Sequence, residues 1–384
     1  MANKRAIYDN LIINKTIFNN LVKFKKTKMP NAFIFHGNDG QGKEAHAIEF
    51  FGLLNCKSNN NFACGSCNSC LKTKKLQHED LKIIFPLPKN KSINKHDSPL
   101  KALNIETIKS MEEMLIKKAT NPYFKIKLKN ANTILINSVR EIKKNINLSV
   151  EKGKYKTYLI FEAEKLCHPN SESANSLLKI LEEPPENVLF ILITSDISLL
   201  LDTIISRCAP IFYPKLKNNK IKEYLDKYDP SNLHNNEIAE ISNGSISNAI
   251  ILLENYEKNM DILNSIINAI IEFKYDKIKN INTFLKDKHE SIEILNLLNL
   301  FFRNVLLDKN EFKYLKKQTD FIISKYKDID WEKCILLVNN TQNYILKNCN
   351  IEIAITSMII ELRKIMENKF YNANVIEEYL NYHN

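Results

Sequence analysis

The sequence has few long apolar stretches, and this absence limits where the protein can reside. In 384 residues, the longest apolar region, 292–307, is interrupted by five polar or charged side chains. No segment therefore has the length and hydropathy of a membrane-spanning helix. The first ten residues also lack the apolar core of a secretory signal. We therefore expect a cytoplasmic protein with no membrane partner.

Arginine is rare among the basic residues, whereas lysine is abundant. Of 55 basic residues five are arginine, and the formal net charge is +11. The lysine excess fits a surface that attracts nucleic-acid phosphates, because bound cations displace condensed counterions. It fits equally a drift toward A/T-rich codons, since asparagine and isoleucine are also frequent, so charge alone leaves both interpretations open. The hydrophobic share of 44% and the length indicate a folded chain of two or three domains.

Glycine is also scarce, yet it is concentrated at one place. Three of the seven glycines fall within six positions, between an expected strand at 32–36 and an expected helix at 42–54. A Gly-rich turn at a helix N-terminus is typical of a phosphate-binding loop, because glycine lets backbone N–H groups approach an anion. The candidate nucleotide-binding residues are Gly37, Asn38, Asp39, Gly40, Gln41, Gly42, Lys43 and Glu44.

Two positions around this loop depart from the pattern of an ATPase. Such a loop ordinarily ends in Lys-Ser or Lys-Thr, whose hydroxyl holds Mg²⁺, but Glu44 follows Lys43 here. A second strand ordinarily ends in Asp-Glu, whereas residues 159–162 read Leu-Ile-Phe-Glu and place Phe161 at the metal position. Both protein anchors for the metal are thus missing. We expect no hydrolysis, and the sequence leaves open whether ATP or ADP is bound or whether the loop is a structural turn.

Strand-like and helix-like segments alternate up to about residue 213, which predicts an α/β fold with a parallel sheet and helices on both faces. Residues 87–131 are rich in lysine and asparagine without a clear pattern, and we interpret them as an insertion. A helix with Val139, Ile142 and Ile146 on one face is expected to begin at Asn137 or Ser138. Beyond residue 215, helical periodicity continues to the end. The other expected elements are strands at 81–85, 157–162 and 188–194 and a helix at 170–183, which Pro184-Pro185 ends.

Four cysteines within fifteen residues predict a metal site. Cys56, Cys64, Cys67 and Cys70 include two Cys-x2-Cys pairs, and each such pair places two sulfurs on one metal. A disulfide cluster is the alternative, but it is uncommon in the cytoplasm. Free thiols are a further alternative. Since no open coordination position or nearby base is evident, we expect a structural zinc ion.

Three further motifs, in order along the chain, carry a resemblance to a known family. They are Ala174–Lys179 (ANSLLK), residues 181–185 (LEEPP) and residues 206–208 (SRC). Together with the altered loop and the cysteine module, they resemble bacterial DNA polymerase III clamp-loader subunits of the AAA+ class over residues 12–260. The resemblance implies an AAA+ P-loop domain at 1–213 with a zinc module at 56–70, a helical lid at 214–260, and a helical collar domain at 261–384.

Within that family, the departures resemble the non-motor delta-prime branch more than the tau/gamma ATPase. A third departure is Ser247, which stands where the motor has a phosphate-sensing arginine. The resemblance then implies that Arg207 acts in trans as an arginine finger on a neighbour's ATP. It also implies tau/gamma and delta subunits, the sliding clamp and primed DNA as partners. The alternatives are a surface arginine at a helix end, an active tau/gamma-type ATPase, and a stand-alone zinc-containing nucleic-acid-binding protein.

Overall fold

The computed structural model describes residues 6–8, 10–58, 61–147, 154–285, 287–307, 315–326 and 329–367. The chain forms two compact units, residues 1–230 with 244–248, and residues 231–243 with 249–384. The predicted domain limits at 213 and 260 stay predictions. The start of the first predicted domain (residues 1–5) and the end of the last (residues 368–384) lie outside the described residues.

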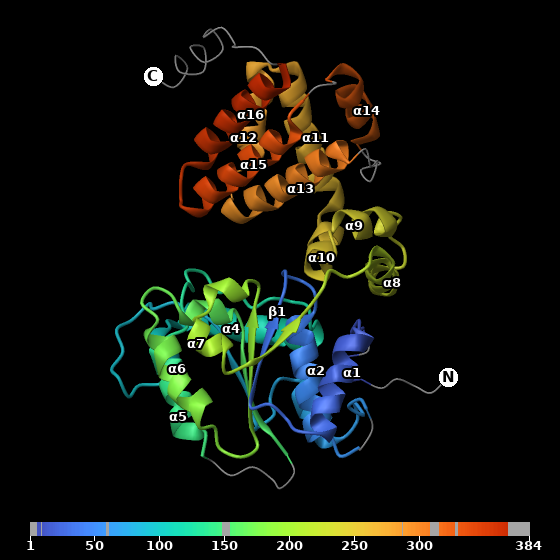
Figure 1. Ribbon diagram of the computed structural model, residues 1–384. Coiled ribbons are helices and arrows are strands. Elements are labelled where there is room, and N and C mark those ends of the chain that lie inside the picture. The colour runs from blue at the N-terminus through green and yellow to red at the C-terminus, as the bar shows by residue number, and fades with distance from the viewer. Residues whose placement is uncertain are drawn as a thin grey trace. The chain divides into compact units, whose positions relative to one another are not determined.

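Five parallel strands form the sheet of the first unit, in the order β2-β3-β4-β1-β5 (Figure 1). The predicted parallel sheet and its four expected strands are confirmed. The fifth strand, β5, was not predicted because it is short, contains Pro210 and is half exposed. The strands are β1 Ala32–His36, β2 Leu81–Ile84, β3 Lys156–Ile160, β4 Val188–Thr194 and β5 Ala209–Phe212.

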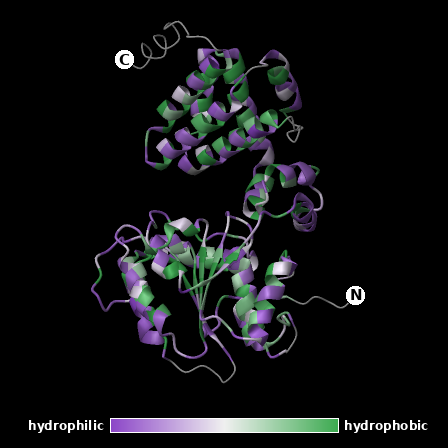
Figure 2. Ribbon diagram, in the orientation of Figure 1, coloured by the Kyte–Doolittle hydropathy of each residue, from purple (hydrophilic) through white to green (hydrophobic). Residues whose placement is uncertain are grey.

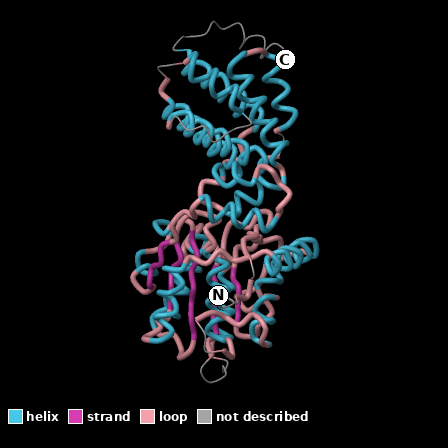
Figure 3. The backbone as a smooth tube through the Cα atoms, turned by 90° about the vertical axis from the view of Figure 1, so that its right-hand side faces the viewer, coloured by secondary structure: helices cyan, strands magenta, loops and turns pink. Residues whose placement is uncertain are grey.

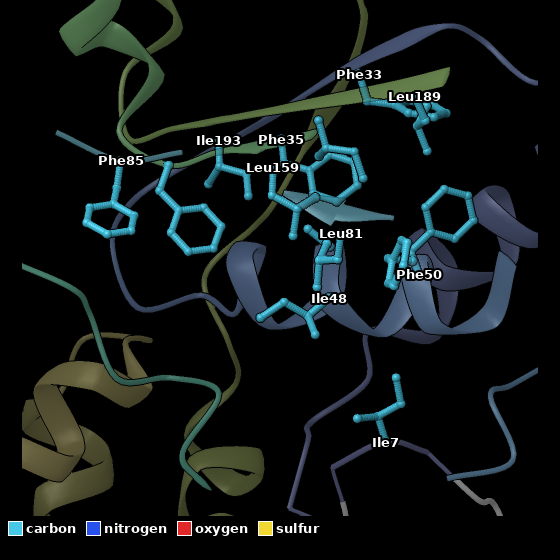
Figure 4. Packing of buried hydrophobic residues seen from close by; sticks show 14 of the residues in the cluster. Ile7, Phe33, Phe35, Ile48, Phe50, Leu81, Phe85, Leu159, Leu189 and Ile193 are labelled. Carbon is cyan, nitrogen blue, oxygen red and sulfur yellow. The ribbon is translucent and has the colours of Figure 1, made fainter. Parts of the chain in front are cut away.

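Helices cover both faces of the sheet because alternate strand residues point to opposite sides. Phe33 and Phe35 of β1 join the core that includes α1, α2 and α4, whereas Ile34 joins the core with α5, α6 and α7. Figure 4 shows the first core, where Phe35, Leu159 and Ile193 from three strands gather above Ile48 of α2. The helices of this unit are α1 Lys15–Lys26, α2 Lys43–Asn55, α3 Asn68–Lys74, α4 Ile105–Thr120, α5 Ile136–Asn145, α6 Glu172–Glu182, α7 Asp202–Ile205 and α8 Asn218–Tyr228, with short 3₁₀ turns at η1 Pro99–Ala102, η2 Ala163–Leu166 and η3 Ile197–Leu199.

The stretch 87–131, predicted to lack a pattern, contains the sixteen-residue helix α4. Its Asn104 cap accepts a hydrogen bond from Thr107 N at 2.8 Å. Lysines and glutamates on its exposed side obscure a narrow apolar face in the sequence. The expected cap of α5 is also wrong, because the cap position is occupied by Leu135, two residues before Asn137 and three before Ser138. Asn137 instead donates to the backbone oxygens of residues 94 and 97, at 2.9 and 2.8 Å, and ties this stretch to α5.

The second unit consists of helices over its described residues, as the periodicity predicts (Figure 3). Apolar positions alternate with polar ones along these helices (Figure 2). Arg363 is buried and donates to the backbone oxygens of Ile270 and Ile271, the last turn of α11, at 3.1 and 2.6 Å. Among the described residues, no helix is long and apolar enough to cross a membrane. The helices are α9 Asn235–Ile241, α10 Ile246–Glu254, which starts in the first unit, α11 Tyr256–Glu272, α12 Tyr275–Phe284, α13 Lys288–Leu306, α14 Lys316–Lys325, α15 Trp331–Leu346 and α16 Ile351–Glu367.

Candidate functional sites

The glycine-rich loop joins the carboxyl end of β1 to α2, as the sequence predicts. Gly40 and Gly42 adopt positive φ angles of 76° and 86°, which side chains disfavour. A Cβ atom on Gly40 would lie 2.0 Å from Ser245 Oγ, and one on Gly42 would lie 3.2 Å from the Tyr123 ring. The cluster of glycines in a glycine-poor chain therefore has a geometric cause.

Lys43, which was expected to reach phosphates, bonds to its own loop instead. Its Nζ donates to the backbone oxygens of Gly37 and Asn38, the latter at 2.7 Å. Burial lowers the pKa of Lys43 to about 8, although Asp39 opposes this shift. A phosphate entering the loop would have to replace these backbone acceptors.

Glu44 forms an ion pair with Lys118, which comes from the last turn of α4. The Lys118 side chain is 1% exposed, and Nζ also donates to the backbone oxygens of Pro122 and Phe124 at 2.9 and 2.7 Å. Burial lowers the pKa of Lys118, and the Glu44 carboxylate opposes that shift. The charge of the Glu44 carboxylate is thus compensated by a cation of the same chain.

The same ammonium group lies over the ring of Phe161, 5.4 Å from its centroid. An aromatic face attracts a cation, but it cannot coordinate a metal through a lone pair. Lys118 therefore contacts Glu44 and Phe161, the two residues predicted to stand in place of the usual metal anchors. An ammonium group of the chain itself thus lies beside both positions at which the sequence predicts that a metal anchor is missing.

Tyr123 lies against the glycine-rich loop, next to Gly42. Its hydroxyl accepts from Ile12 N at 2.8 Å, and its backbone oxygen accepts from Ser247 Oγ at 3.1 Å. Ser247, which the resemblance aligns with a phosphate-sensing arginine, therefore anchors this segment. The Tyr123 ring also packs edge-on against Tyr224 of α8, with centroids 5.3 Å apart. One turn after α4 thus links the loop to α8 and to the start of α10.

A cavity of about 220 Å³ is left beside the loop. This volume is below the roughly 300–1,000 Å³ of typical ligand pockets. Its charged lining mixes both signs, so it does not select strongly for a polyanion. The charged residues are Asp39, Lys43, Glu44, Lys118, Lys125, Lys127, Glu162, Glu164 and Lys165.

Lys118→Ala is expected to lower the unfolding free energy of the first unit by up to about 3–5 kcal/mol, because it leaves the Glu44 carboxylate, which is only 14% exposed, without its cation. Exposed Lys117, one residue earlier, provides the control Lys117→Ala. Urea unfolding with hydrogen exchange of the α2 amides measures the difference. The double substitution Lys118→Met with Glu44→Leu should recover most of the loss. Equal stability of Lys118→Ala and Lys117→Ala would contradict the assigned pair.

Arg207 does not line this cavity and lies in the short connection between α7 and β5. Its side chain is 34% exposed. Nη1 donates to Thr203 O at 2.8 Å, and Nη2 donates to Glu182 Oε1 at 2.9 Å. The guanidinium is therefore accessible to another molecule, and it does not line the pocket of its own chain.

The four predicted cysteines converge. Their sulfur atoms all lie within 4.8 Å of one another, and Cys64 Sγ is 3.9 Å from Cys70 Sγ. Sulfurs at about 2.3 Å from a tetrahedral zinc ion would be separated by roughly 3.8 Å, so the cluster fits such a metal. His78, nearby in the sequence, instead hydrogen-bonds Ser69 Oγ at 3.0 Å. These four cysteines could together hold one metal ion.

Lys118 and Tyr123 are the site residues that sequence reasoning missed. The signal for Lys118 lies in α4, where Ile108, Met111, Leu115 and Lys118 recur on one face. A lysine on an apolar face requires a buried acceptor, and Glu44 was the acid without an explanation.

The parallel sheet and the loop between β1 and α2 define a P-loop α/β protein with a following helical region. The family model described as "DNA polymerase III, delta subunit" matches residues 13–217, more than half of the chain. The chain belongs to this family of DNA polymerase III clamp-loader subunits, which are AAA+ proteins.

Three curated relatives differ in how much of their length is matched. Delta' of Bacillus subtilis is 25% identical over 303 residues, which cover 77% of this chain and 76% of that protein. The gamma subunit of Buchnera aphidicola from Acyrthosiphon pisum is 30% identical over 204 residues, or 49% of this chain and 55% of the relative. Tau of Escherichia coli K12 is 26% identical over 200 residues, which cover 52% of this chain and 24% of tau. The chain thus spans about half the length of the Buchnera relative and a quarter of tau.

Two solved structures align over most of the chain. A gamma-subunit-related protein of Thermotoga maritima has a TM-score of 0.47 at 12% identity and covers 91% of this chain and 99% of its own. The Bacillus subtilis DNA clamp loader delta protein has a TM-score of 0.29 at 9% identity, with 90% and 99% covered. These low scores add nothing to the family assignment.

Proposed function

We propose that this chain is a delta-prime-like, non-motor subunit of the DNA polymerase III clamp loader. In this role it joins tau/gamma and delta subunits in the cytoplasm and helps to load the sliding clamp onto primed DNA. One observation carries the proposal: Lys118 contacts both Glu44 and Phe161, the residues at the two expected metal anchors.

The buried pair opposes nucleotide chemistry in this chain. Hydrolysis of a bound nucleoside triphosphate requires Mg²⁺ to neutralise charge on the phosphates. A metal at this loop would meet the Lys118 ammonium group, and separating Lys118 from Glu44 would leave a buried charge uncompensated. A delta-prime-like role explains why the loop has the glycines of a phosphate-binding loop but lacks the residues that would hold Mg²⁺.

Arg207 gives the chain a part in a neighbour's reaction. In the proposed role its guanidinium contacts the phosphates of ATP bound to an adjoining motor subunit and stabilises charge that develops during phosphoryl transfer. Arginine suits this task because its planar fork binds phosphate oxygens and stays protonated. Its exposure, and the fact that it does not line the cavity of its own chain, support action in trans.

We also propose that Cys56, Cys64, Cys67 and Cys70 hold a structural zinc ion. A bound zinc ion would cross-link this turn-rich segment. It would have a structural role and take part in no reaction. The buried Cys56 and Cys70 sulfurs join the module to the core beside α2.

The purified chain is expected to show no Mg²⁺-dependent ATP turnover above a buffer blank. Added to tau/gamma and delta, it should restore clamp loading on primed DNA, and a fluorescent clamp measures this directly. Turnover by the chain alone would identify an active motor instead. Tight, salt-sensitive DNA binding without partners would favour the stand-alone nucleic-acid-binding protein.

A further inference from the structure

Glu182 and Arg207 are 25 positions apart in sequence but adjacent in the fold. Arg207 Nη2 donates to Glu182 Oε1 at 2.9 Å, while Nη1 donates to Thr203 O at 2.8 Å and approaches Ser206 Oγ at 3.4 Å. The acceptors belong to α6 and to the α7 turn, so they fix both the direction and the plane of the guanidinium. Because a guanidinium has five N–H donors, donors remain for a further acceptor.

The local sequence explains why an acid stands at this position. Helix α6 ends at Glu182 because Pro184-Pro185 cannot continue it. A carboxylate in the last turn of a helix is disfavoured by the helix dipole and gains from a nearby cation. Arg207 supplies that cation, and the carboxylate in turn gives the arginine a fixed partner. Exposed Glu183, the next residue, provides a matched comparison.

We propose that Glu182 is a positioning residue for Arg207, which rests on the proposed role of Arg207 as a finger in trans. The side chains of Glu182 and Arg207 are 50% and 34% exposed, so their pairing contributes little to folding. Its effect is orientation, because an unrestrained arginine populates many rotamers and only some of them reach a neighbouring phosphate. The contact to Glu182 uses one nitrogen and one carboxylate oxygen, so it leaves donors of the guanidinium for a phosphate, whereas a bidentate contact would use one more.

The orientation is measurable on the isolated chain, without any activity. Because the chain has five arginines, their side-chain ¹⁵N signals form a sparse spectrum that substitutions can assign. Glu182→Gln is expected to speed rotation about the Arg207 Cζ–Nε bond by about two- to fivefold, the range that a partly exposed ion pair supports. Glu183→Gln should leave this rotation unchanged. Equal rotation in both variants would overturn the proposal.

The consequence for catalysis is measured in the reconstituted loader. Glu182→Gln is expected to lower kcat of the clamp- and DNA-stimulated ATPase by about two- to fivefold, with KM for ATP unchanged. Glu183→Gln should match the wild type, and Glu182→Gln should add nothing to Arg207→Ala. A silent Glu182→Gln beside an effective Arg207→Ala would overturn this inference alone. A silent Arg207→Ala would overturn the proposed function and, with it, the role of Glu182.

Discussion

Replacing Arg207 by alanine is expected to slow ATP hydrolysis at the adjoining motor site by about 10³–10⁵-fold, the contribution of an arginine finger to phosphoryl transfer. The side chain is exposed, and its hydrogen bonds to Thr203 and Glu182 lie at the surface, so the chain should fold and assemble as before. Single-turnover phosphate release from the reconstituted loader reports the rate at that site.

The variant Arg207→Lys distinguishes the contribution of the planar guanidinium geometry from that of the positive charge. Lysine keeps a positive charge but cannot form the planar two-pronged contact, so it should recover a minor part of the lost rate. Circular dichroism and gel filtration of both variants test folding and assembly. An unchanged phosphate-release phase in Arg207→Ala, with assembly intact, would show that this arginine is not a finger.

Loss of one cysteine ligand is expected to abolish the proposed zinc site. The wild-type chain should contain one zinc ion, and Cys70→Ser should contain close to none, because three thiolates and a hydroxyl hold zinc poorly. Structural zinc contributes on the order of 10–16 kcal/mol of binding free energy in small zinc modules, so the segment around α3 should also unfold locally. Elemental analysis and hydrogen exchange over residues 61–74 measure the two effects.

Exposed Cys349, far from the cluster in sequence, provides the matched substitution Cys349→Ser. It should retain the zinc ion and the wild-type exchange protection. Treatment of the wild type with a strong chelator should reproduce the Cys70→Ser pattern, and added zinc should reverse it. A metal-free wild-type chain that is fully protected over this segment would contradict a structural metal.

The strands that build the site were predictable because they are buried on both faces. Residues 188–194 form a continuous apolar run, which is typical of a central parallel strand, and β4 occupies that position. The glycine cluster after β1 was equally informative, since few residues tolerate its backbone angles. Local sequence therefore sufficed for the frame of the pocket and for the cysteine cluster.

The position of Lys118 beside the loop was not predictable from local patterns. Glu44 and Lys118 are 74 positions apart, and a lysine in a lysine-rich helix is ordinarily interpreted as solvated. Only the fold places α4 beside the loop and shows that this particular lysine is buried. The pairing of Glu182 with Arg207 was missed for a similar reason, because β4 and α7 separate the two residues in the chain and no periodicity relates them.

The ammonium group of Lys118 differs from a dissolved ion in one respect: the backbone holds it in place. It cannot exchange with solvent unless α4 moves, so its presence does not vary with the supply of magnesium or nucleotide in the cell. In the proposed ring, the neighbours would change state with every ATP they consume. In this subunit the charge at the loop would stay the same at each step. Its surface toward the neighbouring subunits would therefore stay constant while they change conformation.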